Sequence, residues 1–406
     1  MTKNFSCERK LLVRGNRRLG GPILAMPVRI HAREAKRVAA LIFIISLLVA
    51  ACGREEGPAP VDASADSNDA PVQSTESDAP AAGDVRADGT FHIVATTTQA
   101  SDLSAILSAG VDGIEITPLM GAGVDPHLYQ PTESDIRAMN RADMVIYSGL
   151  HLEGQFDAVF AALREQGTLV YALSQPVKDA GYVIGGFVTE QYQAGTDDPH
   201  FWFDPRNWEL TVTDLAQTLA ELDPAGAVAY AANAELYRAQ LQALFGWADE
   251  GMRSVAEGQR YLVTSHDAFQ YFGSAYGWKM TAIQGISTED EAGVRDIQET
   301  VQFVIEQGIP VLFVESSIPP NTIEAVQAAI VAGGGAARVG VRELYSDAMG
   351  MPGTFGGTYI GMIAENVLTI LQSYQCAGAG ARIPDWPQAI GIEPPQELLE
   401  VDCGSG

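Results

Sequence analysis

The sequence has little cysteine and little histidine, and it lacks several familiar catalytic motifs. Its 406 residues include only four Cys and six His. The Cys residues neither lie beside a His nor form a Cys-X-X-Cys spacing, which argues against a thiolate site for copper(I) or a metal cluster. No His-Glu-X-X-His motif is present, and the glycine run Gly333–Gly335 lacks the following Lys of a phosphate-binding loop. Metalloprotease chemistry of that type and nucleotide binding are therefore not indicated.

Basic residues are also few. The chain contains 25 Lys and Arg against 51 Asp and Glu, which gives a formal net charge of −26. Ten of the basic and two of the acidic residues fall within residues 1–51, so the remainder carries a net charge of −34. Such a body repels nucleic acid and anionic lipid, and we expect no nucleic-acid partner. The acidity either attracts cations or serves solubility alone.

The N-terminal segment has the pattern of an export signal. An apolar run over residues 38–51 follows a basic region and is shorter than the roughly 20 residues that span a bilayer. It ends in Val-Ala-Ala-Cys at Cys52, which resembles a bacterial lipobox. This resemblance implies a lipoprotein signal peptide over 1–51 and a lipid attached to Cys52. Translation from Met26 would give a signal of ordinary length, and the alternative is an ordinary membrane anchor with an incidental Cys.

Large apolar residues are almost absent from residues 52–90, which are rich in Ala, Asp, Ser and Pro. Such a segment cannot bury enough surface to offset the entropy of ordering, so we expect a disordered acidic tether. Together with the lipid, it would keep an exported protein at the membrane, facing the periplasm or the cell exterior.

From residue 91 onward, short β-rich runs alternate with amphipathic helices, which is typical of an α/β protein with mostly parallel sheets. We expect two lobes, over residues 91–222 and 257–376, each with a four-stranded sheet flanked by helices. The predicted strands are Phe91–Thr97, Gly113–Leu119, Asp143–Ser148 and Thr168–Ala172 in the first lobe, and Arg260–Thr264, Lys279–Gln284, Pro310–Glu315 and Ala337–Glu343 in the second.

The segment between the lobes, 223–256, predicts one long rigid helix that joins them. Asp223 and Pro224 suit a helix start, and the Ala-rich stretch that follows contains no further Pro. At 1.5 Å per residue the helix would measure roughly 45 Å. Two shorter helices with a break near Gly246 are the alternative. After the second lobe comes a tail, 377–406, which a disulfide between Cys376 and Cys403 would fasten in an oxidising compartment.

Four polar residues are candidate metal ligands. Two Asp-Pro-His tripeptides end at His127 and His200, and Pro makes each loop rigid. His266 follows a predicted strand, and Asp347 lies in a loop of the second lobe. In open α/β sheets, ligands bind at the carboxyl ends of strands. Imidazole nitrogen with carboxylate oxygen suits divalent first-row cations. Each residue alone fits an ordinary surface or core role, but the joint pattern favours a metal site.

Residues 91 to about 375 resemble the metal-binding solute-binding proteins of ABC importers, the TroA-like family (cluster A-I). The resemblance implies two lobes joined by one long helix, with an ion bound between them by His127 and His200 from the first lobe and by His266 and Asp347 from the second. His151 matches a family position that is usually not a ligand, so we expect either a structural role or a role in contact with the ligands. The matching segments are Gly123–Tyr129, Ser148–Glu153, Pro199–Pro205, Val263–Phe272, Gln284–Thr288, Phe313–Ile318, Leu344–Gly350 and Gly357–Tyr359.

The resemblance implies that the protein captures manganese, zinc or iron and delivers it to an ABC permease with a cytoplasmic ATPase. We expect a monomer and no enzymatic activity. A metal-dependent adhesin or structural lipoprotein is the first alternative, and a zinc hydrolase is the second. Full ligation by protein leaves no open position for a reactive water, which argues against the hydrolase.

The choice among these ions stays open at the level of sequence. Three His and one Asp fit tetrahedral zinc. The stretch Gly185–Asp198, however, lacks the His-rich loop of the zinc-specialised branch of the family. Because protonated His cannot bind metal, affinity should fall as the pH falls through the His range near ~6.5.

Overall fold

The computed structural model describes residues 89–185, 196–289 and 291–403. The predicted signal peptide, Cys52, the possible start at Met26 and nearly all of the predicted tether lie outside the described residues. The described part belongs to one compact unit, Glu76–Gly406. Within it, no helix is both long enough and apolar enough to cross a bilayer.

The first lobe contains one parallel sheet with the strand order β2-β1-β3-β4. Its central strands are buried apolar runs, and Ile93 of β1 pairs with Ile116 of β2 and with Met144 of β3. The predicted capping start at Thr132 is confirmed, because Thr132 and Asp135 form a reciprocal capping box at the start of α3. The elements are β1 (Phe91–Ala95), α2 (Thr98–Leu107), β2 (Ile114–Pro118), α3 (Glu133–Met139), β3 (Met144–Tyr147), α4 (Asp157–Glu165), β4 (Leu169–Ala172) and α5 (Gln175–Asp179).

The second lobe contains the four predicted strands, all parallel, but it pairs them as β5-β6 and β7-β8. This differs from the continuous four-stranded sheet that the sequence predicts. Strands β7 and β8 are only two residues long, and the ladder continues as single contacts: Phe313 N donates to Val263 O at 2.8 Å, and Glu315 bridges Leu344. The elements are β5 (Tyr261–Thr264), α8 (Gln270–Tyr276), β6 (Lys279–Ala282), α9 (Val294–Gln307), β7 (Val311–Leu312), α10 (Asn321–Ala332), β8 (Arg338–Val339) and α11 (Tyr359–Cys376).

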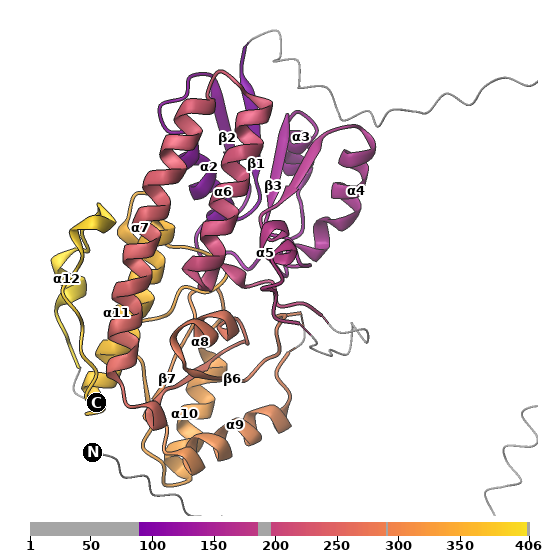
Figure 1. Ribbon diagram of the computed structural model, residues 1–406. Helices are drawn as coiled ribbons and strands as arrows, with labels where there is room; N and C mark the ends of the chain where they lie inside the picture. The colour runs from indigo at the N-terminus through magenta and orange to yellow at the C-terminus, as the bar shows by residue number, and fades with distance from the viewer. Residues whose placement is uncertain (1–88, 186–195, 290, 404–406) are drawn as a thin grey trace, which may run out of the picture. The chain divides into compact units, whose positions relative to one another are not determined.

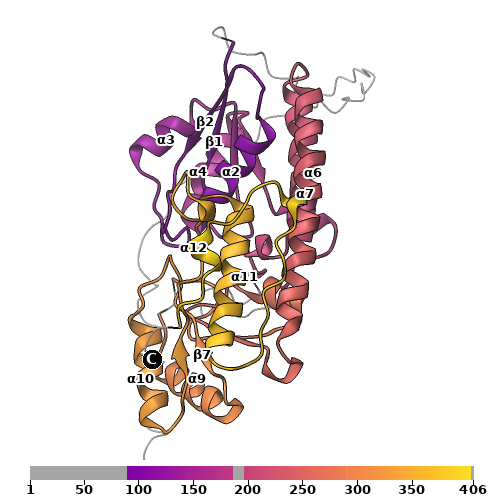
Figure 2. The same cartoon turned by 90° about the vertical axis from the view of Figure 1, so that its left-hand side faces the viewer.

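Two long helices lie between the lobes in the chain. Helix α6 (Pro205–Leu222) begins with Asp204 as its cap, and α7 (Ala227–Ser254) runs for 28 residues without a break at Gly246. At 1.5 Å per residue, α7 measures about 42 Å. It extends alongside elements of both lobes and packs against α6 and α11 (Figures 1 and 2). Its buried face shares one hydrophobic core with side chains of both lobes, so the helix is held in place along its length.

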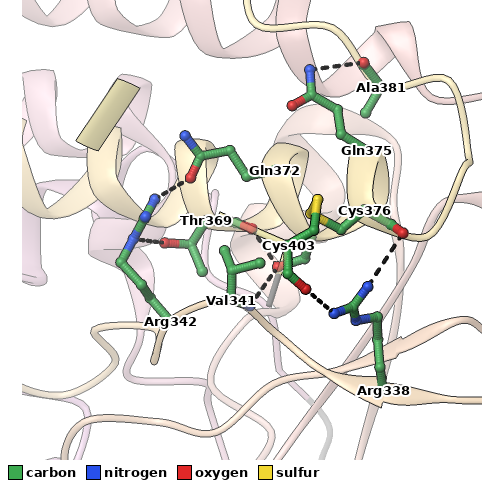
Figure 3. The surroundings of a disulfide bond; sticks show 10 residues. Arg338, Val341, Arg342, Thr369, Gln372, Gln375, Cys376, Ala381 and Cys403 are labelled. Atoms are coloured by element: carbon green, nitrogen blue, oxygen red, sulfur yellow. Dashed lines mark hydrogen bonds between the residues drawn. A yellow bond between two sulfur atoms is a disulfide. The ribbon is translucent and has the colours of Figure 1, made fainter. Parts of the chain in front are cut away.

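The tail after α11 packs against α7. Trp386 contacts Trp247 with ring centroids 4.8 Å apart, and the indole of Trp247 donates to Pro384 O. A disulfide joins Cys376 to Cys403 (Figure 3). The guanidinium of Arg338 donates to the carbonyls of both cysteines, which connects the tail to β8 (Figure 3). The tail also contains η6 (Gln388–Ile390) and α12 (Gln396–Leu399).

Candidate metal centre

The structure brings the four predicted ligand residues together. His127 lies in the loop after β2, and His200 directly precedes η3 (Phe201–Phe203) and α6. His266 lies in the loop after β5, and Asp347 lies in the loop after β8. One nitrogen or oxygen of each residue lies within 4.8 Å of those of the other three.

The distances describe a small polyhedron of four donor atoms. His200 Nε2 lies 3.3 Å from His127 Nε2 and 3.3 Å from His266 Nε2. Asp347 Oδ1 lies 3.2 Å, 3.4 Å and 4.0 Å from Nε2 of His200, His266 and His127. Four ligands placed tetrahedrally at 2.0–2.1 Å from a zinc ion are about 3.3–3.4 Å apart. The cluster therefore has the size of a tetrahedral metal site.

The four side chains are buried, and one of their atoms has no donor. His200 and His266 are fully buried, and Asp347 is 1% exposed. The Oδ1 atom of Asp347 accepts no hydrogen bond within the described residues. An anionic oxygen out of contact with water is costly unless it is paired. A cation placed among the three Nε2 atoms and Oδ1 would supply the missing partner.

Carboxylates orient two of the imidazoles. His200 Nδ1 lies 2.8 Å from Asp198 Oδ1, and His266 Nδ1 lies 2.6 Å from Glu315 Oε2. The backbone N–H groups of the same two His donate to Asp198 Oδ1 and Glu315 Oε1. A proton on Nδ1, facing the carboxylate, leaves the lone pair of Nε2 directed into the cluster. Converging lone pairs 3.3 Å apart require a proton or a metal cation between them.

The loop of His127 is tied to both lobes. The N–H of His127 donates to Asp125 Oδ1 at 2.9 Å, within the first Asp-Pro-His tripeptide. The other oxygen of Asp125 accepts from Thr288 Oγ1 of the second lobe at 2.7 Å. Asp347 has a matching link in the opposite direction, because its carbonyl accepts from Gln99 Nε2 of α2 at 3.0 Å.

The charges of the cluster are strongly coupled. Burial is the main reason why the pKa of His127 is lowered to about 3. Burial also disfavours the charged forms of His200 and His266, but Asp198, Glu315 and Asp347 outweigh it and raise both pKa values. Burial opposes ionisation of Asp347, yet the three His hold its pKa well below the usual range. A divalent cation bound by Nε2 of His200 and His266 would have to displace any proton held there.

His151 stands apart from the four. Its side chain is 58% exposed, and its Nδ1 lies 3.3 Å from Asp157 Oδ2. Both Leu150 and His151 have positive φ, at 54° and 64°. Buried Glu153 shapes this loop by accepting hydrogen bonds from Ser148 N, Gly149 N and Thr96 Oγ1. The structure therefore places His151 outside the group of four converging residues.

Sequence reasoning missed the residues that orient the ligands. Asp125 and Asp198 open the two Asp-Pro-His tripeptides, so a signal for them was present. Glu315 and Ser317, whose Oγ lies 3.3 Å from Asp347 Oδ2, lie 49 and 30 residues from the ligands that they contact. Both lie in the matching segment Phe313–Ile318, but no local pattern indicates which ligands they contact.

Comparison with known proteins gives concordant matches. The family model described as the periplasmic zinc-uptake complex component A (ZnuA) matches residues 93–373. The manganese-binding lipoprotein MntA of Bacillus subtilis is 38% identical over 287 residues, which is 71% of this chain and 90% of MntA. The zinc-binding protein TroA of Treponema pallidum is 36% identical over 288 residues, covering 71% of this chain and 90% of TroA.

Further matches agree in function class and in fold. The metal ABC transporter substrate-binding lipoprotein FimA of Streptococcus parasanguinis is 31% identical over 245 residues, covering 59% of this chain and 77% of FimA. The solved structure of the periplasmic zinc-binding protein TroA superimposes with a TM-score of 0.65 at 36% identity. It covers 72% of this chain and 100% of that structure. The two-lobed α/β fold joined by one long helix, predicted above, is confirmed.

Proposed function

Because this chain belongs to the family of the periplasmic zinc-uptake complex component A, we propose that it captures one divalent transition-metal ion between its lobes and delivers it to the permease of an ABC importer. The ion is cargo, and manganese, zinc and iron are the candidates. MntA is named for manganese, TroA for zinc, and FimA for ABC transport, and these names support the class of cargo and of partner.

One observation carries the assignment of the site. His127, His200, His266 and Asp347 form a buried, metal-sized polyhedron in which Asp347 Oδ1 has no hydrogen-bond donor. Each lobe supplies two of the four ligands. The ion would therefore bridge the lobes, and binding would bias their relative position.

The rest of the unit limits that motion. The continuous helix α7 and the core that it shares with both lobes oppose large displacements. Hydrogen bonds also join the lobes in this structure, among them Gln155 Nε2 to Glu289 Oε1 at 2.9 Å. A permease that binds the closed form better than the open form would thereby recognise the metal-loaded protein. The free energy for closure comes from the higher affinity of the closed form for the metal.

Proteins of this family are substrate-binding components of transporters and not enzymes. Four protein ligands leave no position for an activated water, and this supports the absence of hydrolytic activity here. A lipid on Cys52 would anchor the protein outside the cytoplasm, as the names of MntA and FimA suggest by analogy. We expect a monomer that works beside a permease and its ATPase.

Elemental analysis and competition titration test the proposal. Protein purified without added metal should contain close to one equivalent of Mn, Zn or Fe. The variant with His127, His200, His266 and Asp347 all replaced by Ala should contain none, whereas His151→Ala, outside the cluster, should match the wild type. Equal metal content in the four-ligand variant would refute the site. Unchanged uptake of all three metals after deletion of the gene would refute transport.

A further inference from the structure

The short segment after β7 contacts both metal ligands of the second lobe. Glu315 binds the ring and the backbone N–H of His266. Two residues later, Ser317 Oγ lies 3.3 Å from Asp347 Oδ2. The position of this serine determines whether the second oxygen of Asp347, Oδ2, is available to bind a metal ion.

A second hydroxyl lies within hydrogen-bonding distance of the Ser317 hydroxyl. Ser346 is fully buried, and its Oγ lies 2.8 Å from Ser317 Oγ. When Ser346 donates to Ser317, the single hydroxyl hydrogen of Ser317 is left for Asp347 Oδ2. The two carboxylate oxygens of Asp347 then differ. Oδ2 accepts from Ser317, whereas Oδ1 has no donor and faces the three Nε2 atoms.

The number of ligating oxygens separates the candidate ions. Zinc is satisfied by four ligands in a tetrahedron. Manganese favours oxygen donors and higher coordination numbers. A carboxylate that offers both oxygens would supply a fifth donor, and one that offers a single oxygen would not.

We propose that Ser317 is a selectivity residue, which engages Oδ2 of Asp347, restricts that carboxylate to one metal-binding oxygen and so favours Zn²⁺ over Mn²⁺. The inference rests on the proposed function of the four-residue cluster as a metal site. Ser317 would thus influence which ion is bound without contacting the ion.

Four substitutions isolate the hydroxyl. Ser317→Ala removes it and frees Oδ2. Ser317→Thr and Ser317→Val have the same shape and differ in the hydroxyl alone. Ser316→Ala is the matched control, because the Ser316 hydroxyl belongs to the same loop but makes no hydrogen bond within the described residues.

Competition titrations with Zn²⁺ and Mn²⁺ measure the selectivity directly. In Ser317→Ala and Ser317→Val, the ratio of the Mn²⁺ Kd to the Zn²⁺ Kd should fall about tenfold, the lower end of the effect of an outer-shell partner. Ser317→Thr and Ser316→Ala should keep the wild-type ratio. In Co²⁺-loaded protein, the intense visible bands of four-coordinate cobalt should weaken only in the two variants that lack the hydroxyl.

An unchanged ratio and an unchanged cobalt spectrum in both hydroxyl-free variants would overturn the inference. So would an equal loss of affinity for both metals, since that would show a purely structural role. If Ser317→Ala fails to fold, the Thr and Val pair still decides. These failures leave the proposed function intact, whereas a wild-type protein that binds neither metal would overturn both.

Discussion

The two lobes hold their proposed metal ligands by different means. In the first lobe, His127 and His200 are each bound by the Asp two positions earlier in the chain. In the second lobe, His266 and Asp347 depend on Glu315 and Ser317, which lie 49 and 30 residues away. The first pair is therefore organised by local loops, and the second pair by contacts between separate strands.

This difference follows the architecture of the lobes. The first lobe has a continuous four-stranded sheet, and each of its ligand loops contains the Asp that binds its His. The second lobe has two pairs of short strands, and the segment after β7 supports both of its ligands. We infer that the second lobe is where small changes in packing alter the site most.

Removal of a ligand should have the largest effect and should not depend on the lobe. His200→Ala and His266→Ala should each weaken metal binding by more than about 100-fold, beyond the 10–100-fold range of outer-shell partners. Each change removes one of four donors and leaves Asp347 less compensated. Isothermal titration against a competing chelator measures the loss. A much smaller loss for one of the two would mean that this His is not a ligand.

Replacement of the carboxylates that orient the imidazoles should weaken metal binding more in the second lobe than in the first. Glu315 uses one oxygen for the backbone N–H and the other for the ring of His266, so Glu315→Gln must lose one acceptor. Asp198 uses Oδ1 for both contacts, so Asp198→Asn is able to keep them. We expect roughly 10–100-fold weaker metal binding for Glu315→Gln and a smaller loss for Asp198→Asn.

Urea unfolding of the two metal-free variants provides a second measurement of the same contrast. Glu315→Gln should cost about 1.5–3 kcal/mol, the range of a hydrogen bond to a charged group. Asp198→Asn should cost less. Equal losses in both affinity and stability would remove the distinction between local and non-local support.

Metal binding should weaken as the pH falls. Carboxylates raise the pKa of His200 and His266 above the ordinary value, so metal must displace protons from them even near neutral pH. Affinity should fall about tenfold per pH unit for each proton released, and the fall should begin above pH ~6.5. Titrations between pH 5.5 and 8.5 (about three units) measure it. A flat profile would argue against ligation by these His.

The stability of the metal-free protein should depend on pH in two opposite ways, because the pKa is raised for two of the His and lowered for the third. The contribution of protonated His200 and His266 is fully present below the unfolded pKa of ~6.5 and is lost as the pH rises through their raised folded values. The pKa of His127, lowered to about 3, has the opposite effect, and stability falls as the pH drops from ~6.5 towards that value. Urea midpoints of wild type and His127→Gln separate the two contributions, because the acid-side loss should shrink in the variant.

The disulfide should matter least to metal binding. Cys376→Ser together with Cys403→Ser opens a loop with a sequence separation of 27 residues. This should lower the free energy of unfolding by about 3 kcal/mol. Metal affinity should stay within about twofold, because none of the four ligands forms a hydrogen bond with the described part of the tail. Thermal unfolding and metal titration of the same variant measure the two effects, and a large loss of affinity would mean that the tail positions the lobes.

Much of the scaffold could be predicted because its signals are local. The eight strands and the long helix follow from apolar runs, caps and the lack of Pro over 225–255. The start of that helix was placed slightly early, since Pro224–Gly226 form a turn before Ala227. The pairing of the second-lobe strands was not predicted, because apolar runs do not specify how far a ladder of two-residue strands extends.

By itself, the sequence determined which residues are able to bind a metal and, through the two Asp-Pro-His tripeptides, how the first-lobe ligands are presented. Only the tertiary structure decided that all four donor atoms lie within 4.8 Å of one another, and that Glu315 and Ser317 orient the second-lobe pair. The physical reason is distance along the chain. Rigid turns act within a few residues, whereas contacts between strands and lobes form only when the whole unit has folded.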